Sequence, residues 1–244
     1  YLWATGFVYG IAMMAAFLRG TSIEEAAIEA QCGVIGNVGF LGVPMLTLLM
    51  GEAAIGPVML VLSVDLIVFG SLIVILVTGS RGEDPGLRVF RTVGMGLLKN
   101  PMIMSITLGL LWSASGAAIP SVMNDFLDIL GGAATPGALF AIGASLATKR
   151  LDRPMIAGWL SVSKLGLHPL FAAFACLVLF PVEPYAAAVM IAAASLPVAG
   201  NVYILAEHYG VAPQRVSASI LISTGFAVIT VSLVIGWVSG LYTP

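Results

Sequence analysis

Gly36-Asn37-Val38-Gly39-Phe40-Leu41-Gly42-Val43-Pro44 is the stretch that decides the fold of this chain. It lies in a run, from about residue 30 to residue 50, that is apolar enough to cross a bilayer. Three glycines and a proline weaken a helix here, at about 1 kcal/mol for each glycine and about 3 kcal/mol for the proline. In hydrocarbon a broken helix is tolerated only where protein or a water-filled cavity satisfies the freed backbone groups, so the break predicts a site.

The composition places the chain in a membrane. Of the 244 residues, 59% are hydrophobic and 9% are charged, whereas soluble chains carry about 25% charged residues. The mean hydropathy is +1.06. Apolar runs of roughly 18 to 28 residues recur, each long enough for a bilayer core of about 30 Å. Such continuous runs exclude an outer-membrane barrel, so we predict an all-α polytopic membrane protein.

Eight membrane spans can be drawn, over about residues 1–18, 28–50, 53–78, 100–115, 119–148, 154–180, 185–209 and 213–241. If the first residue lies outside, nine loop cations fall on the inner side and none on the outer side. These cations are Arg19, Arg81, Arg88, Arg91, Lys99, Lys149, Arg150, Arg153 and Arg215. The positive-inside rule therefore predicts a multi-pass protein of the inner (plasma) membrane with both termini outside.

A second break, from Leu196 to Val202, makes the two halves of the chain alike. Spans one to three can be laid on spans six to eight with an offset of about 153 to 159, which puts Pro44 on Pro197. The two triplets run in opposite directions. An inverted repeat with a broken helix in each half is typical of secondary transporters whose site lies near the membrane midplane.

Each break carries an asparagine in the tripeptide Gly-Asn-Val. If the broken helices cross, the amides and the free N–H groups of the half-helix amino termini meet at one point, which suits a carboxylate. The alternative is that the asparagines only bridge loose backbone. The predicted substrate-binding residues are Asn37, Gly42, Pro44, Pro197, Gly200 and Asn201.

Three further residues are candidates for ion coupling. Lys164 and Asp65 are the only basic and acidic residues predicted deep in the bilayer, where an unpaired charge costs roughly 3 kcal/mol or more. We predict a Lys164/Asp65 pair or a shared proton. The alternative is that Lys164 binds backbone carbonyls while Asp65 is protonated or faces water. His168, one turn from Lys164, could titrate in a proton-coupled cycle or be structural.

Other chemistries find little support in the sequence. Cys32 and Cys176 lie inside apolar spans and are expected to be small buried hydrophobes. No metal motif, no nucleophile and base pair and no basic patch is present, so we expect neither an enzyme nor a nucleic-acid partner, and no cofactor beyond a coupled proton or sodium ion. Tyr1 enters an apolar span without a methionine, which indicates a chain that is incomplete at its amino terminus.

Four motifs in order resemble the auxin efflux carrier family, which includes the plant PIN transporters and bacterial carriers for malate and malonate. The motifs are Asn37-x-x-Phe40-x-Gly42-x-Pro44, Lys99-Asn100-Pro101, Pro136-x-x-Leu139-Phe140-x-x-Gly143, and Leu196-Pro197 followed by Ala206-Glu207-x-Tyr209-Gly210-Val211. The resemblance implies a fold like that of the bile acid sodium symporters, with ten helices in two inverted five-helix repeats, a scaffold domain and a transport domain. It also implies that Asn37 contacts the substrate carboxylate and that Pro44 and Pro197 mark the crossover.

On this resemblance the chain starts near the third helix of the family fold. Residues 1–78 would be the last three helices of the first repeat, residues 79–98 a cytoplasmic loop, and residues 99–244 the second repeat. We predict a secondary carrier of a small organic anion such as a mono- or dicarboxylate, with alternating access of the elevator type. The expected partners are that anion and the lipid bilayer, with a homodimer left open. A non-transporting receptor or scaffold, an inactive fragment and a passive channel are the alternatives.

Overall fold

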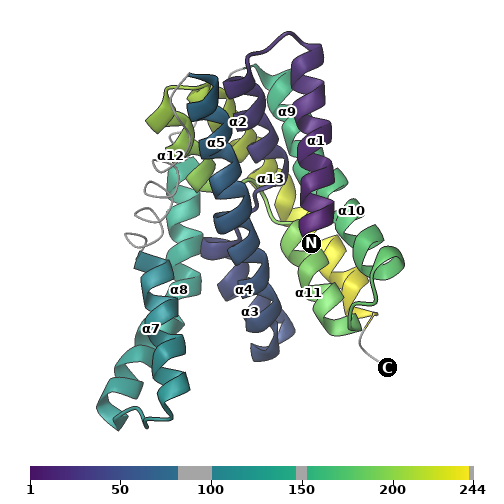
Figure 1. Cartoon of the computed structure of the whole chain (residues 1–244). Coiled ribbons are helices and arrows are strands. Elements are labelled where there is room, and N and C mark those ends of the chain that lie inside the picture. The colour runs from purple at the N-terminus through teal and green to yellow at the C-terminus, as the bar shows by residue number, and fades with distance from the viewer. Residues whose placement is uncertain (82–100, 147–152, 242–244) are drawn as a thin grey trace.

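The computed structural model describes residues 1–81, 101–146 and 153–241, and every regular element in these ranges is a helix (Figure 1). The longer elements are α1 (Leu2–Leu18), α2 (Ile23–Val34), α3 (Val43–Met50), α4 (Ile55–Ser63), α5 (Gly70–Ser80), α7 (Pro101–Ser115), α8 (Ser121–Leu146), α9 (Pro154–Val162), α10 (His168–Phe174), α11 (Pro184–Ala194), α12 (Gly200–Tyr209) and α13 (Pro213–Ser239). Some of them are joined by short segments of other helix types. Four of the described segments are π-helical turns: η1 (Val38–Gly42), η3 (Val64–Phe69), η4 (Ser163–Leu167) and η5 (Ala175–Leu179). Another described segment is a 3₁₀ turn, η2 (Glu52–Ala54).

These helices confirm the all-α membrane class. Their ends lie within a few residues of the eight predicted segments, and three continuous helices are long and apolar enough to cross a membrane: Glu52–Ser80, Pro154–Leu179 and Pro213–Ser239. The number of spans and the inverted repeat stay predictions. The predicted loop 79–98 lies, from residue 82 onward, outside the described residues, as do Lys99, Lys149 and Arg150.

The helix is interrupted at residues 35–37, several residues before Pro44, where the crossover of the two broken helices was predicted. Ile35, Gly36 and Asn37 leave the helix, whereas Pro44 is the second residue of α3, inside a helix that runs from Val38 to Met50. The π turn η1 explains this correction. Proline cannot donate to the carbonyl four residues before it, and a wide turn ahead of it absorbs the misfit. The second π turn of this kind, η4, likewise precedes a proline at the second position of its helix.

The two breaks cross as short extended segments. Gly36 pairs with Val198 in an isolated antiparallel bridge. The Asn37 N–H donates to the Pro197 carbonyl at 2.8 Å, and the Ala199 N–H donates to the Ile35 carbonyl at 3.0 Å. In each break, these two hydrogen bonds give partners to backbone groups that would have none in hydrocarbon.

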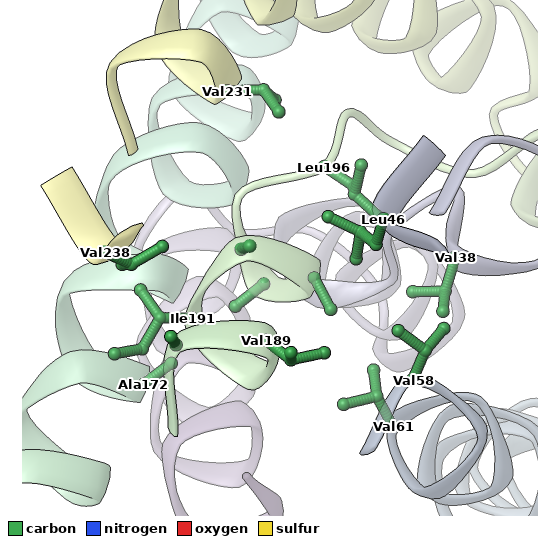
Figure 2. Packing of buried hydrophobic residues seen from close by; sticks show 14 of the residues in the cluster. Val38, Leu46, Val58, Val61, Ala172, Val189, Ile191, Leu196, Val231 and Val238 are labelled. Atoms are coloured by element: carbon green, nitrogen blue, oxygen red, sulfur yellow. The ribbon is translucent and has the colours of Figure 1, made fainter. Parts of the chain in front are cut away.

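The crossing lies where two hydrophobic clusters meet. Figure 2 shows part of the first cluster, in which Val38 and Leu46 of the first broken helix lie close to Leu196 of the second. The second cluster includes Ile35 and Val198, which flank the same bridge. Each extended segment therefore passes from one packed core to the other, and packing on both sides holds the crossing in place.

One end of the bundle gathers charged side chains. Arg19 at the end of α1 and Arg215 at the start of α13 both pair with Glu29 of α2, and the Arg215 to Glu29 distance is 2.5 Å. Arg81, after α5, pairs with Glu24 of α2 at 3.2 Å. Three of the cations predicted to lie on the inner side are thus joined by the glutamates of one helix.

Candidate functional site

A cavity of about 240 Å³ lies beside the crossing. Both breaks contribute to its wall, the first through Gly36 and Asn37 and the second through Gly200 and Asn201. The remaining wall comes from the turn after the first break and from α4, η3 and α12. The structure thus brings together, across more than half of the sequence, the two asparagines that the Gly-Asn-Val tripeptides singled out.

Two helix amino termini open at this cavity. The helix that follows Asn37 begins at Val38, and its next two residues, Gly39 and Phe40, line the cavity; α12 begins there with Gly200 and Asn201. The first N–H groups of a helix have no partner within it and carry about half a positive charge. Both termini therefore present donors and a positive potential to the same small volume, which is the environment that an anion requires.

Asp65 adds an acid to the same wall. Its side chain lies in the π turn η3 and is 4% exposed. The Tyr1 hydroxyl donates to Oδ1 of Asp65 at 2.8 Å. Among the described residues, Oδ2 of Asp65 and Oδ1 of Asn201 are two of six buried side-chain atoms without a hydrogen-bond partner in the protein, and both belong to residues that line the cavity.

Lys164 and His168 lie behind the crossing and do not line the cavity. Lys164 is 0% exposed, and its Nζ donates to the Ala194 carbonyl at 2.5 Å and lies 3.1 Å from Nδ1 of His168. No ion pair joins Lys164 to Asp65 in the described structure, so the two side chains make no direct contact, and a proton shared between them stays a prediction. The ammonium instead caps the carboxyl end of α11, where the helix dipole favours a cation, as the alternative reading expected.

Two glycines lie in close contact with their neighbours at the crossing. A Cβ on Gly36 would lie 3.2 Å from Cε and 3.3 Å from Nζ of Lys164, and a Cβ on Gly42 would lie 2.6 Å from a methyl carbon of Leu196. Gly42 therefore packs the crossing and does not line the cavity. Pro44, in α3, does not line the cavity either, whereas Pro197 faces a separate, largely apolar cavity of about 530 Å³ beside α13.

Sequence reasoning missed several residues that build the site. Tyr1 positions Asp65, Thr5 accepts or donates at 3.0 Å from Nε2 of His168, and the Ser223 hydroxyl accepts from the Val198 N–H at 3.1 Å. Serine, threonine and tyrosine in apolar helices are common, so no local signal separates these three from other hydroxyl residues. Gly36 could have been found, because it precedes one of the two asparagines.

The described residues hold no group of three or more histidine, cysteine or acidic side chains that could bind a metal ion. Cys32 and Cys176 are free and buried.

Comparison with known proteins agrees with this architecture. The family model described as "Membrane transport protein" matches residues 1–235. A protein of Rhizobium meliloti (strain 1021), named "Putative malonate transporter", is 31% identical over 221 residues, which make up 88% of this chain and 68% of that protein. The chain therefore belongs to this family of membrane transport proteins, as its resemblance to the auxin efflux carriers indicated.

Proposed function

We propose that the protein is a secondary transporter of a small organic anion, a mono- or dicarboxylate, and that the cavity at the crossing is its substrate site. The observation that carries the proposal is the meeting of two helix amino termini and two asparagines around one volume of about 240 Å³. Membership of a membrane transport family supports the transport activity.

The chemistry of the wall favours a carboxylate over other small ligands. The N–H groups at Gly39, Phe40, Gly200 and Asn201 are fixed donors, and an Asn37 amide can add a neutral donor that turns toward either oxygen. Drug-sized ligands need about 300 Å³ or more. A cavity of about 240 Å³ therefore suits a ligand of a few carbon atoms, and the name of the Rhizobium relative makes malonate the first compound to test.

The proposed movement follows from how the helices are arranged. In Figure 1, α7 and the first part of α8 extend to one side of the molecule, away from α1, α9 and α10. Contacts between α8 and the first broken helix are made through η1 and α3. We propose that the crossing helices move as one body against α7 and α8, and so expose the cavity to each side of the membrane in turn, with the arginine-rich end of the bundle in the cytoplasm.

The test is counterflow of labelled malonate in liposomes that contain the purified protein, compared between wild type and Asn37→Ala. Loss of an amide from the cavity should reduce exchange at least tenfold, because a hydrogen bond to a charged group is worth about 1.5–3 kcal/mol. Asn124→Ala is the matched control. Asn124 is exposed on α8 and bonds to Asp128 at 2.9 Å, far from the cavity wall.

If Asn37→Ala exchanges malonate as fast as the wild type, the cavity at the crossing is not the substrate site. Binding of malonate without flux in the wild type would instead identify a receptor. Flux without saturable counterflow would identify a channel.

A further inference from the structure

We propose that each anion crosses the membrane together with one proton, and that Oδ2 of Asp65 carries this proton. The inference rests on the proposed function, since it concerns the same cavity. It assigns Asp65 a role beside the substrate, whereas Lys164 and His168 lie behind the crossing and keep fixed positions.

The geometry at Asp65 selects one of its two oxygens. Tyr1 donates to Oδ1 at 2.8 Å, so Oδ1 acts as an acceptor. Oδ2 has no partner among the described residues, although the side chain is 4% exposed and lines the cavity. A carboxylic acid with its proton on Oδ2 keeps the Tyr1 hydrogen bond and gains a donor that points to the substrate.

Charge balance explains why a proton should accompany the anion. Lys164 is fully buried, and it lies directly behind Gly36 of the cavity wall, since a Cβ on Gly36 would come within 3.3 Å of Nζ. With Lys164 as an ammonium and Asp65 as a carboxylate, the empty site has no net charge. A bound anion would leave uncompensated negative charge in a buried, low-dielectric site, which is costly. One added proton removes one unit of that charge, which makes the loaded site neutral for a monoanion and halves the excess for a dianion such as malonate.

The proton step can be written out in full. From the side to which the cavity opens, the Asp65 carboxylate takes one proton and forms an O–H bond at Oδ2. That O–H donates to the substrate carboxylate, as when two carboxylates in one site share a proton. After the cavity opens to the other side, the anion leaves, the O–H bond breaks, and the proton passes to water. Asp65 is then a carboxylate again.

His168 is placed less well for this task. Thr5 donates from Oγ1 to the Tyr1 carbonyl at 3.0 Å, so Thr5 accepts from Nε2–H of His168, and Nδ1 of His168 accepts from the Lys164 ammonium. Both ring nitrogens are therefore used, and His168 does not line the cavity. Among the described residues, the titratable side chains near Asp65 are Tyr1, just before α1, Lys164 in η4 and His168 at the start of α10.

Malonate uptake into liposomes under a pH gradient of about one unit, alkaline inside, tests this inference, with the membrane potential clamped to zero. One proton on Asp65 is worth about a factor of ten in accumulation for each pH unit. We expect Asp65→Asn to accumulate about tenfold less malonate than the wild type. Accumulation is read at steady state, so a slower exchange in Asp65→Asn does not by itself change the ratio, and counterflow at equal pH reports separately whether the variant still transports. His168→Gln should keep the pH-driven accumulation.

Equal accumulation in Asp65→Asn and wild type would overturn the inference, as would accumulation that follows a sodium gradient and ignores pH. If Asp65→Asn does not fold, a pH-sensitive dye inside wild-type liposomes gives the answer. Malonate entry must then acidify the interior by at least one proton for each anion, and entry without acidification overturns the inference. Absence of counterflow in the wild type would reject the proposed function itself, which distinguishes the two failures.

Discussion

Replacement of Gly36 by alanine should destabilise the protein through a collision at the crossing. The added Cβ would lie 3.2 Å from Cε and 3.3 Å from Nζ of Lys164, and 3.4 Å from Cβ of Leu196. Lys164 and Leu196 are both 0% exposed, and the ammonium is held by the Ala194 carbonyl at 2.5 Å. Neither neighbour can move by a few tenths of an ångström without loosening another contact.

The size of the effect follows from two opposing terms. Overpacking of a core costs about 1–3 kcal/mol, and the loss of backbone freedom in the unfolded chain offsets about 0.4–1 kcal/mol of this. The net loss is about 1.3 kcal/mol at the midpoints of these ranges and at most about 2.6 kcal/mol, or up to roughly 10 °C in the unfolding midpoint at about 2–4 °C for each kcal/mol. Apparent midpoints of the detergent-purified protein, measured at one heating rate, give the comparison.

Gly166→Ala is the matched control for this experiment. Gly166 lies in η4 next to Leu165, and a Cβ there would meet no atom within 4 Å, so its midpoint should stay the same or rise. The loss in Gly36→Ala should also shrink in a Lys164→Met background, where the ammonium is gone. A Gly36→Ala midpoint equal to that of Gly166→Ala would refute the reasoning.

Three further changes test other contacts. Ser223→Ala removes the acceptor of a buried N–H in the second break and should cost about 1–3 kcal/mol in thermal unfolding. Glu29→Gln leaves Arg215 buried with a weaker partner and should lower the unfolding midpoint by more than any other charge removal at this end of the bundle, since breaking a buried pair costs about 3–5 kcal/mol. The third change is Glu24→Gln. The Arg81 guanidinium lowers the pKa of Glu24, so the pair stabilises the folded protein at pH values above the ordinary carboxyl pKa. This small stabilisation is lost as the pH falls through the lowered pKa of Glu24.

Each of these changes has a control in the chain. Ser232→Ala alters an exposed hydroxyl that bonds within its own helix turn. An equal loss of thermal stability in Ser232→Ala would show that the Ser223 hydrogen bond is not the cause of the loss in Ser223→Ala. Glu52→Gln alters an exposed carboxylate, and an effect as large as that of Glu29→Gln would contradict the buried pair. For Glu24, the difference in unfolding midpoint between wild type and Glu24→Gln should vanish at acidic pH. A difference that grows at acidic pH would contradict a stabilising Glu24–Arg81 pair.

Much of the site could be predicted because its parts carry local signals. Glycine and proline in an apolar run mark a helix break wherever they occur, and an asparagine is rare enough there to stand out. Asn37, Gly200 and Asn201 were found in this way, and all three line the cavity. Asp65 was found by its charge, although its partner is Tyr1 and not Lys164.

The sequence by itself determined that this chain is an all-α membrane protein and that two of its apolar segments are broken, because hydrophobic length and helix propensity are properties of neighbouring residues. Tertiary structure alone decided that Gly36 meets Val198, that Pro44 stays within a helix, and that Lys164 caps α11 behind the cavity. These contacts depend on the register in which distant segments cross. That register is set by packing on both sides of the crossing, where a shift by one residue would turn each side chain to the opposite face.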